Sequence, residues 1–322
     1  MAIYYYVIVL FAVFFFIAPR CSVIHASGND MAPQNNISKP LVISSSNSSE
    51  PTIQQPPKLT VVTSFFPIYE FAKHVGGDRV NVMTLIPAGI EPHDYEPTIQ
   101  QLQEAENADV VFFNGLGFES SWIDRVNNDN LVDTSVLSNL SQGSQIRNPH
   151  IWLDPVFAKT QVQQIKNALM EIDPNNKLYY QKNAMDFIAK LDLLDSEIRA
   201  ALQTCNKKDF IAFHDAFDYL AKRYGLIQHS IQGVSPEGEI LPQRIEETIR
   251  LAKDLGLNVI YAEELVDPRF AEVIAQEIPN GKVLVLSPLE GIEKNEESSG
   301  IGYLDKMKQN ISNLKVGLEC LT

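Results

Sequence analysis

The feature that most constrains the fold is a run of about thirty residues, 175–204, which contains no glycine or proline. Its apolar residues recur at helical spacing, at Ala184, Phe187, Ile188, Leu191, Leu194, Ile198 and Leu202. At ~1.5 Å per residue, such a helix is roughly 45 Å long. Since this exceeds the width of one small domain, we expect the helix to connect two domains.

Strand-like and helix-like segments alternate at short intervals on both sides of this run. Before it, apolar strand patterns occupy 59–63, 81–86 and 109–115, and helical patterns occupy 67–75, 97–108 and part of 150–174. After it, strands are expected at 209–214, 226–234, 257–263 and 282–289, with helices at 215–225, 242–256, 267–279 and 303–320. Such alternation is typical of parallel sheets covered by helices. We therefore predict an α/β protein with two similar Rossmann-like lobes, 58–173 and 205–322, joined by one long rigid helix, 174–204.

The first 57 residues differ in character from the rest of the chain. Residues 3–18 are almost entirely apolar, which predicts a signal peptide cleaved near Ala26 or an anchor retained in the membrane. Cys21 follows Arg20, which does not suit a lipid-attachment motif. Residues 27–57 are rich in Ser, Asn, Gln and Pro, as expected of a flexible tether. We therefore divide this part into 1–26 and 27–57 and expect an exported protein, either tethered to the outer face of the cytoplasmic membrane or free in the periplasm or a pseudoperiplasm.

The net charge limits the ligands and partners that we expect, and the cysteines allow a disulfide. The formal net charge of −14 argues against nucleic acid, which requires a basic face, and mildly favours cations as ligands. Glycosylation sequons, weak indicators of an exterior location, begin at Asn36, Asn47, Asn139 and Asn310. Cys205 and Cys320 suit either one disulfide or two buried thiols, and the residues alone leave both open.

Three of the six histidines share a structural context. His93 follows the strand 81–86, His214 ends the strand 209–214, and His150 stands at the entry to a helix. Open α/β sheets bind ligands beyond the carboxyl ends of their strands, so the three imidazoles could converge between the lobes. A nitrogen-rich site suits zinc and neighbouring transition metals, whereas calcium and magnesium prefer oxygen. The spacing alone favours three separate loop histidines, because such widely separated ligands form no motif.

Nearby carboxylates could orient these rings through the second imidazole nitrogen. Asp94 and Glu96 closely follow His93, and Asp154 lies close to His150. The alternative is that these three acidic groups are simply solvated.

Several stretches, taken together, resemble the zinc- and manganese-specific solute-binding proteins of ABC importers. The resemblance extends over "VVTSFFPIYEFAKHVGGDRVNVMTLIPAGIEPHDYEPTIQQLQEAENADVVFFNGLGFE", "NPHIWLDP", "FIAFHDAFDYLAKRYGL" and "YLDKMKQNISNLKVGLE", and so over roughly residues 58–322. It implies two α/β lobes on a rigid helix with the metal between them, and His93, His150 and His214 as the first three ligands. Manganese-type members have Glu at the third position, so His214 points to Zn²⁺, with Mn²⁺ as the alternative.

The fourth ligand departs from the family pattern, which usually has an Asp after the last strand. In "VLVLSPLEGIE", Ser287 occupies that position and Glu290 is close enough to substitute, while Glu91 or a water molecule are further candidates. The histidine-rich loop of many zinc-type members is also missing, since residues 119–149 contain no histidine. The "LEC" ending and the cysteine before the "HDAF" strand imply, by resemblance, a disulfide between Cys205 and Cys320.

The resemblance implies a non-enzymatic, monomeric protein that captures Zn²⁺ outside the membrane and delivers it to an ABC permease with its ATPase. The N-terminus would provide the membrane contact. Alternatives are an Mn²⁺ or Fe²⁺ binding protein of the same family, a zinc-dependent hydrolase or a surface adhesin. A hydrolase needs an open coordination position and a general base, and the chain contains no HExxH or GxSxG motif.

Overall fold

The structure, a computed structural model, describes residues 58–135 and 148–321. The predicted signal peptide or anchor, the predicted tether and the sequons at Asn36, Asn47 and Asn139 lie outside these residues. All the described residues belong to one unit, Gln55–Thr322. Among the helices in the described ranges, none is both long and apolar enough to cross a membrane.

The amino-terminal lobe is built on a parallel four-stranded sheet in the order β2-β1-β3-β4. Its strands are β1 Leu59–Thr63, β2 Val80–Thr84, β3 Val110–Phe113 and β4 Leu131–Asp133. Its helices are α1 Phe66–Gly76, α2 Ile99–Glu106 and α3 Pro155–Ile172, with short 3-10 turns η1 Gly77–Arg79, η2 Ile123–Arg125 and η3 Ile151–Leu153. The sequence pattern did not predict β4, because three residues are too few to show a period.

The carboxy-terminal lobe repeats this arrangement with the strand order β6-β5-β7-β8, again all parallel. Its strands are β5 Asp209–Ala212, β6 Ile227–Ser230, β7 Val259–Ala262 and β8 Lys282–Val285. Its helices are α5 Asp218–Tyr224, α6 Pro242–Asp254, α7 Arg269–Gln276, α8 Lys294–Ser298 and α9 Tyr303–Gly317. The predicted α/β fold with two similar lobes is confirmed, and only α8 has no counterpart among the predicted helices.

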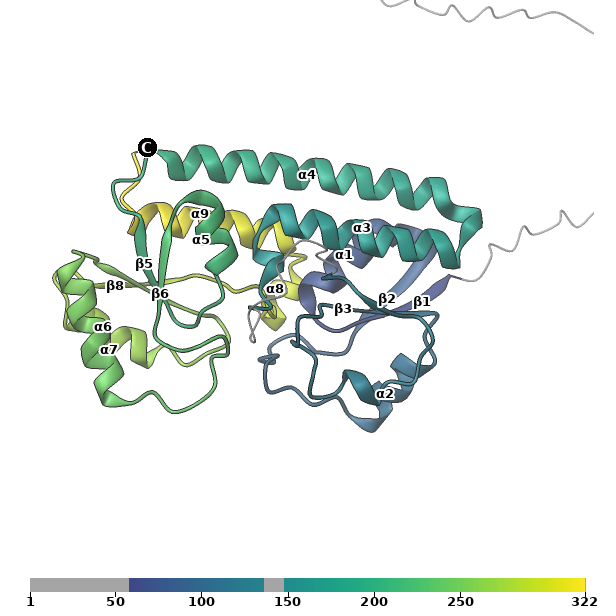
Figure 1. The fold of residues 1–322 in the computed structure, drawn as a ribbon, viewed down its shortest axis with the longest axis horizontal. Coiled ribbons are helices and arrows are strands. Elements are labelled where there is room, and N and C mark those ends of the chain that lie inside the picture. The colour runs from purple at the N-terminus through teal and green to yellow at the C-terminus, as the bar shows by residue number, and fades with distance from the viewer. Residues whose placement is uncertain (1–57, 136–147, 322) are drawn as a thin grey trace, which may run out of the picture. The chain divides into compact units, whose positions relative to one another are not determined.

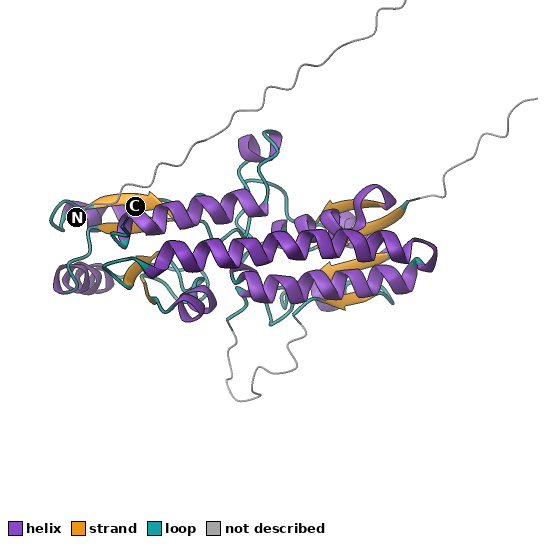
Figure 2. Cartoon of the chain, turned by 90° about the horizontal axis from the view of Figure 1, so that it is seen from above, coloured by secondary structure: helices purple, strands orange, loops and turns teal. Residues whose placement is uncertain are grey.

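The predicted connecting helix is α4, Lys177–Gln203, which follows the 3-10 turn η4 Pro174–Asn176. Figures 1 and 2 show it running along both lobes. Its buried face consists of Tyr180, Ala184, Phe187, Leu191, Leu194, Ile198 and Leu202. This stripe matches the predicted apolar spacing except that Ile188 is only partly buried.

A second helix, α9, also joins the lobes. Tyr303 at its first position packs edge-on against Phe71 of α1, with ring centroids 4.9 Å apart. Its hydroxyl donates a hydrogen bond of 2.6 Å to the backbone oxygen of Trp152. One continuous apolar core includes Phe71 and Trp152 from the first lobe and Phe210 and Met307 from the second. Separating the lobes would expose this shared core to water, so the core favours their close packing.

Cys205 and Cys320 form a disulfide that joins the end of α4 to the segment after α9. Of the two possibilities that the residues left open, the structure therefore contains the disulfide.

Two local expectations are corrected. The helix expected from Pro97 begins at Ile99, because Thr98 caps it and forms a capping box with Gln101. The sequon at Asn310 does not mark the exterior, since this side chain is 1% exposed inside α9.

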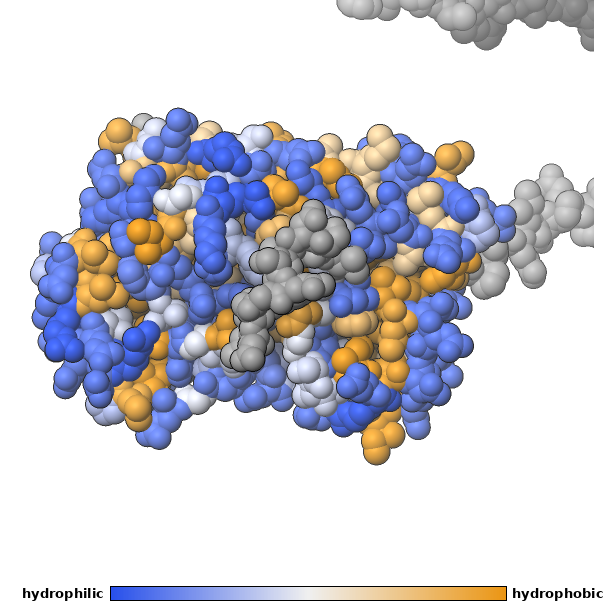
Figure 3. Space-filling view, in the orientation of Figure 1, coloured by the Kyte–Doolittle hydropathy of each residue, from blue (hydrophilic) through white to orange (hydrophobic). Residues whose placement is uncertain are grey.

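The face drawn in Figure 3 is mostly hydrophilic, with apolar residues in small groups. Dispersed apolar residues of this kind are normal on a protein surface.

Candidate metal centre

Four side chains from the loops at the carboxyl ends of the two sheets meet at one point. His93 lies in the loop after β2, and His150 lies immediately before η3. His214 follows β5 by two residues, and Glu290 lies in the loop after β8. Parallel strands bring the loops at their carboxyl ends to the same edge, which explains the convergence of residues up to 197 positions apart.

The four donor atoms lie close enough together to hold one metal ion. The Oε1 atom of Glu290 lies 3.0 Å from Nε2 of His93, 2.6 Å from Nε2 of His150 and 3.2 Å from Nε2 of His214. The Nε2 atoms of His150 and His214 are 3.1 Å apart, and all four atoms lie within 4.8 Å of one another. Ligand atoms of a tetrahedral zinc ion, at bonds of ~2.0–2.1 Å, stand roughly 3.3 Å apart. The donor set of three imidazoles and one carboxylate suits zinc.

The centre is largely closed to solvent. His150 and His214 are fully buried, Glu290 is 3% exposed, and the side chain of His93 is 10% exposed. The His93 ring packs edge-on against Phe118, with ring centroids 5.1 Å apart. His93 therefore forms the most accessible side of the cluster.

Asn148 orients the ring of His150. Its side-chain oxygen lies 2.6 Å from Nδ1 of His150 and also accepts the backbone N–H of that residue at 3.0 Å. The amide group of Asn148 donates to the backbone oxygen of Asp215 at 2.6 Å, which leaves its oxygen to face the imidazole. An acceptor beside Nδ1 favours the tautomer with the proton there, so that the Nε2 lone pair points into the cluster.

Glu263 has the same relation to His214. Its Oε1 atom lies 2.7 Å from Nδ1 of His214 and accepts the backbone N–H of His214 at 3.2 Å. Glu263 directly follows β7, the neighbour of β5 in the sheet, so the two residues meet at one sheet edge. The carboxylate thus directs Nε2 of His214 towards Glu290.

Burial and charge determine the protonation of the centre. Burial lowers the pKa of His150 to about 4, despite the opposing effect of Glu290. Burial also disfavours the charged form of His214, but the carboxylates of Glu263 and Glu290 outweigh it and raise its pKa well above the ordinary value. The pKa of Glu290 lies well below its usual range, because the attraction of His214 and His93 outweighs its burial. In the absence of a bound ion, these pKa shifts favour the ionised form of Glu290, the neutral form of His150 and the protonated form of His214.

The other proposed fourth ligands lie outside this group of four. The Oγ atom of Ser287 donates to Glu264 and accepts the backbone N–H of Leu289. Glu91 accepts the backbone N–H of His93 at 3.0 Å. Burial, reinforced by the neighbouring Glu237, raises the pKa of Glu91 to about 9, so this group is a neutral acid at pH 7.

The carboxylates expected to orient the histidines have other partners. Asp154 accepts the backbone N–H of Val156 at the start of α3 and pairs with Arg223. Glu96 pairs with Arg125, and Asp94 is exposed. Proximity in sequence therefore misidentified these residues, while Asn148 and Glu263 were missed. The "NPH" tripeptide, with an amide two residues before a histidine, was the available signal for Asn148.

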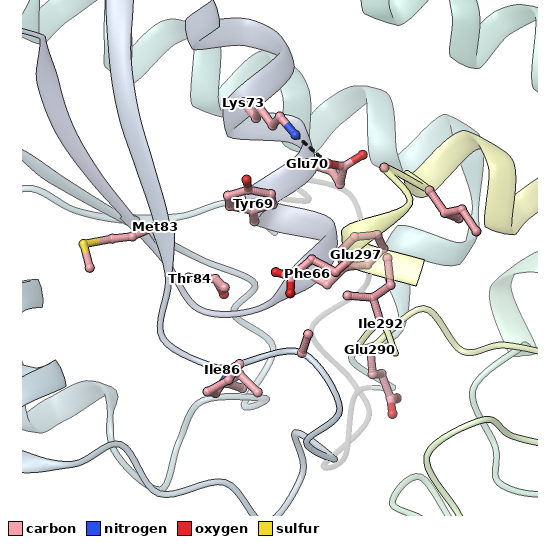
Figure 4. Close-up of a pocket in the computed structure, with 15 residues that line it drawn as sticks. Phe66, Tyr69, Glu70, Lys73, Met83, Thr84, Ile86, Glu290, Ile292 and Glu297 are labelled. Carbon is pink, nitrogen blue, oxygen red and sulfur yellow. Dashed lines mark ion pairs between the residues drawn. The ribbon is translucent and has the colours of Figure 1, made fainter. Parts of the chain in front are cut away.

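A cavity of about 310 Å³ adjoins the loop that carries Glu290 (Figure 4). Its lining includes Phe66, Tyr69, Glu70 and Lys73 from α1, together with Ile292. In Figure 4 the Glu290 carboxylate points away from the labelled residues of α1. Glu290 also lines the cavity, whereas the three histidines do not, so the cavity meets the four-residue cluster only at Glu290.

Comparison with known proteins places this geometry in a family. The family model described as zinc-uptake complex component A, periplasmic, matches residues 61–317. The high-affinity zinc uptake system protein ZnuA of Bacillus subtilis (strain 168) is 38% identical over 282 residues, 81% of this chain and 88% of that protein. The zinc-binding lipoprotein AdcA of Streptococcus pneumoniae serotype 4 is 33% identical over 280 residues, 80% of this chain but 55% of AdcA. The chain thus spans about half the length of that relative.

A solved structure agrees with the sequence comparisons. The crystal structure of the Zn(II)-bound ZnuA-like domain of Streptococcus pneumoniae AdcA superimposes with a TM-score of 0.73 and 34% identity, over 82% of this chain and all of that domain. The chain therefore belongs to the family of periplasmic zinc-uptake complex component A proteins.

Proposed function

We propose that this chain is the extracytoplasmic solute-binding component of a metal ABC importer. It captures Zn²⁺ between its two lobes and delivers the ion to a permease. The observation that carries the proposal is the convergence, within 4.8 Å, of three imidazole nitrogens and one carboxylate oxygen from both lobes. The zinc-bound state of the similar AdcA domain supports it.

The number of donors favours binding over hydrolysis. Catalytic zinc sites keep a coordination position open for water, whereas four protein ligands complete a tetrahedron. His93, His150, His214 and Glu290 together supply four donors. A zinc ion held by all four has no place for a hydrolytic water, and so the site suits capture and release of a cargo ion.

The donor set also favours Zn²⁺ over Mn²⁺. Imidazole nitrogen suits zinc, whereas manganese prefers carboxylate, carbonyl and water oxygens. The third position is His214 rather than a glutamate, so only one of the four donors is an oxygen. We therefore place Zn²⁺ first and Mn²⁺ second.

The proposed partners and location follow from the family. We place the chain outside the cytoplasmic membrane, as a monomer anchored or exported through residues 1–26 and 27–57, beside a permease and its ATPase. The names of the relatives, one periplasmic family and one lipoprotein, support this location. The linking helix 174–204 then limits hinge closure between lobes 58–173 and 205–322, and small tilts and loop movements release the ion.

The test is a metal-content measurement and competition titration on the purified chain, beside His214→Ala. We expect one tightly bound Zn²⁺ per chain and a large loss of affinity in the variant. His229→Ala is the matched control, because His229 lies in β6 and pairs with Asp209 rather than with the cluster. Tighter binding of Mn²⁺ would overturn the metal assignment. Zinc-dependent hydrolysis of generic esters or peptides would overturn the transport role.

A further inference from the structure

Side chains of α9 hold the backbone of the loop that carries Glu290. The side-chain oxygen of Asn310 accepts the backbone N–H of Ser287 at 2.8 Å, and its amide group donates to the backbone oxygen of Ser287 at 2.7 Å. Asn310 is 1% exposed and Ser287 is 2% exposed. One side chain thus satisfies both backbone groups of a buried residue three positions before Glu290.

A second set of contacts reaches the same residue from one turn earlier in α9. The ammonium group of Lys306 lies 3.0 Å from Oε1 of Glu264, and that same oxygen accepts the hydroxyl of Ser287. The Ser287 oxygen in turn accepts the backbone N–H of Leu289 at 3.1 Å. Lys306 is 2% exposed, so the contact is shielded from solvent. Because Lys306 and Asn310 are four residues apart, they lie on the same face of the helix.

The backbone between Ser287 and Glu290 is strained and needs contacts from other elements to hold its conformation. Leu289 has φ of +56°, a left-handed conformation that is unfavourable for a residue with a branched side chain, and it is fully buried. The indole N–H of Trp152 donates to the backbone oxygen of Pro288 at 2.7 Å. Contacts from α9 and from the amino-terminal lobe therefore hold the two residues before Leu289, and the turn at Leu289 then directs Glu290 at the histidines.

We propose that Asn310 is a positioning residue for the metal centre, which sets the place of the Glu290 carboxylate through the backbone of Ser287. The inference rests on the proposed function, because it assumes that the four-residue cluster binds Zn²⁺. Residues that orient metal ligands typically contribute about 10- to 100-fold to affinity without touching the ion. The burial of Asn310 in these contacts also excludes glycosylation of its sequon in the folded protein.

A double-mutant cycle on zinc affinity tests this coupling. Asn310→Ala, Glu290→Ala and the double variant are titrated with Zn²⁺ against a chromophoric competitor, beside the unsubstituted chain. If Asn310 acts through Glu290, Asn310→Ala weakens binding about 10-fold or more in the unsubstituted chain but less than about twofold once Glu290 is gone. Absorption spectra of the Co²⁺-loaded proteins provide a second readout. The bands of Asn310→Ala should shift towards those of Glu290→Ala, a change that a general loss of stability does not produce.

Asn313→Ala is the matched control. Asn313 lies on the same helix and donates a hydrogen bond of 2.7 Å to the backbone oxygen of Val285, ahead of the Glu290 loop. The zinc affinity and the Co²⁺ spectrum of Asn313→Ala should equal those of the unsubstituted chain. If Asn310→Ala does not fold, Asn310→Ser, which also shortens the side chain that reaches the Ser287 backbone, replaces it in both backgrounds under the same criterion.

The outcomes separate this inference from the proposed function. An equal loss of affinity in the presence and absence of Glu290 overturns the positioning role, as does no loss at all. In both cases the unsubstituted chain still binds zinc, and the proposed function stands. Failure of the unsubstituted chain to bind zinc overturns both proposals.

Discussion

The Nδ1 nitrogen of His214 lies 2.7 Å from the Oε1 oxygen of Glu263, and both side chains are buried. The pair spans two adjacent parallel strands, β5 and β7, at the sheet edge where the three histidines and Glu290 meet. Glu263 and Glu290 contact opposite sides of the same imidazole. The ring is therefore held between two carboxylates, one that orients it and one that lies within the cluster.

This arrangement predicts that zinc binding releases a proton. His214 is protonated in the metal-free protein because Glu263 and Glu290 raise its pKa, and a metal ligand must give up that proton. Below this raised pKa, affinity should fall about tenfold for each unit of acidification, which corresponds to one proton per ion. Above it, this dependence should vanish. Calorimetric titration at pH 7 in two buffers of different ionisation enthalpy measures the release directly.

The control for proton release is Glu263→Gln, which removes one of the two charges that raise the pKa of His214. Less proton release is expected in this variant at the same pH. Identical binding enthalpies in the two buffers for the unsubstituted chain would contradict the assignment of a protonated His214.

The contact between Asn148 and His150 predicts a role for a residue that is not itself a ligand. Asn148→Ala removes the acceptor that orients the His150 ring and the bond to Asp215 in the other lobe. Zinc affinity should fall by about 10- to 100-fold. Asn176→Ala, which loses only a contact with Asp173, is the control and should bind like the unsubstituted chain. An affinity of Asn148→Ala within twofold of the control would exclude the orienting role.

The fourth ligand can be identified by comparing three substitutions. Glu290→Ala removes the only carboxylate in the cluster and should weaken zinc binding by more than about 100-fold, beyond the usual effect of an orienting residue. Glu91→Gln replaces a neutral acid by a neutral amide and should change affinity little. Ser287→Ala should have an intermediate effect, because Ser287 shapes the loop. A larger loss in Glu91→Gln than in Glu290→Ala would reverse the assignment.

Metal binding should stabilise the fold. An ion that binds only the native state at 100 times its dissociation constant adds about 2.7 kcal/mol to the free energy of unfolding. For a chain of this size, with an unfolding entropy of about 2.1 cal/mol/K per residue, that corresponds to a rise in Tm of about 4 to 5 °C. Thermal melts with Zn²⁺ and with a chelator measure the difference, and His150→Ala should abolish it. Equal Tm values for the unsubstituted chain under both conditions would argue against a native-state zinc site.

The disulfide should contribute to stability rather than to zinc affinity. It joins residues 115 positions apart, and its removal by Cys205→Ser with Cys320→Ser should lower the free energy of unfolding by about 2–4 kcal/mol. Because such a bridge acts mainly on the unfolded chain, zinc affinity should change less than about threefold. On the same preparation, denaturant titration measures the free energy of unfolding and metal competition measures the zinc affinity. A large loss of zinc affinity with an unchanged free energy of unfolding would show instead that the disulfide supports the metal site.

The sequence by itself determined the α/β fold, the connecting helix and the position of three histidines at loops beyond strands. These features depend on local periodicity and on the rule that parallel strands end at one edge. Short elements such as β4 and α8 have too few residues to show a period, and the sequence did not reveal them.

Only the tertiary structure decided which groups surround the histidines. The sequence suggested Glu290 as the fourth ligand and left Ser287 and Glu91 open as alternatives, and the path of the loop after β8 brings Glu290 alone among them into the cluster. The tertiary structure also pairs His150 with Asn148 and His214 with Glu263. Asp154, which the sequence suggested as a partner of His150, caps α3 instead. Hydrogen-bond partners are set by loop conformation and strand neighbours, and neither leaves a periodic trace in the sequence.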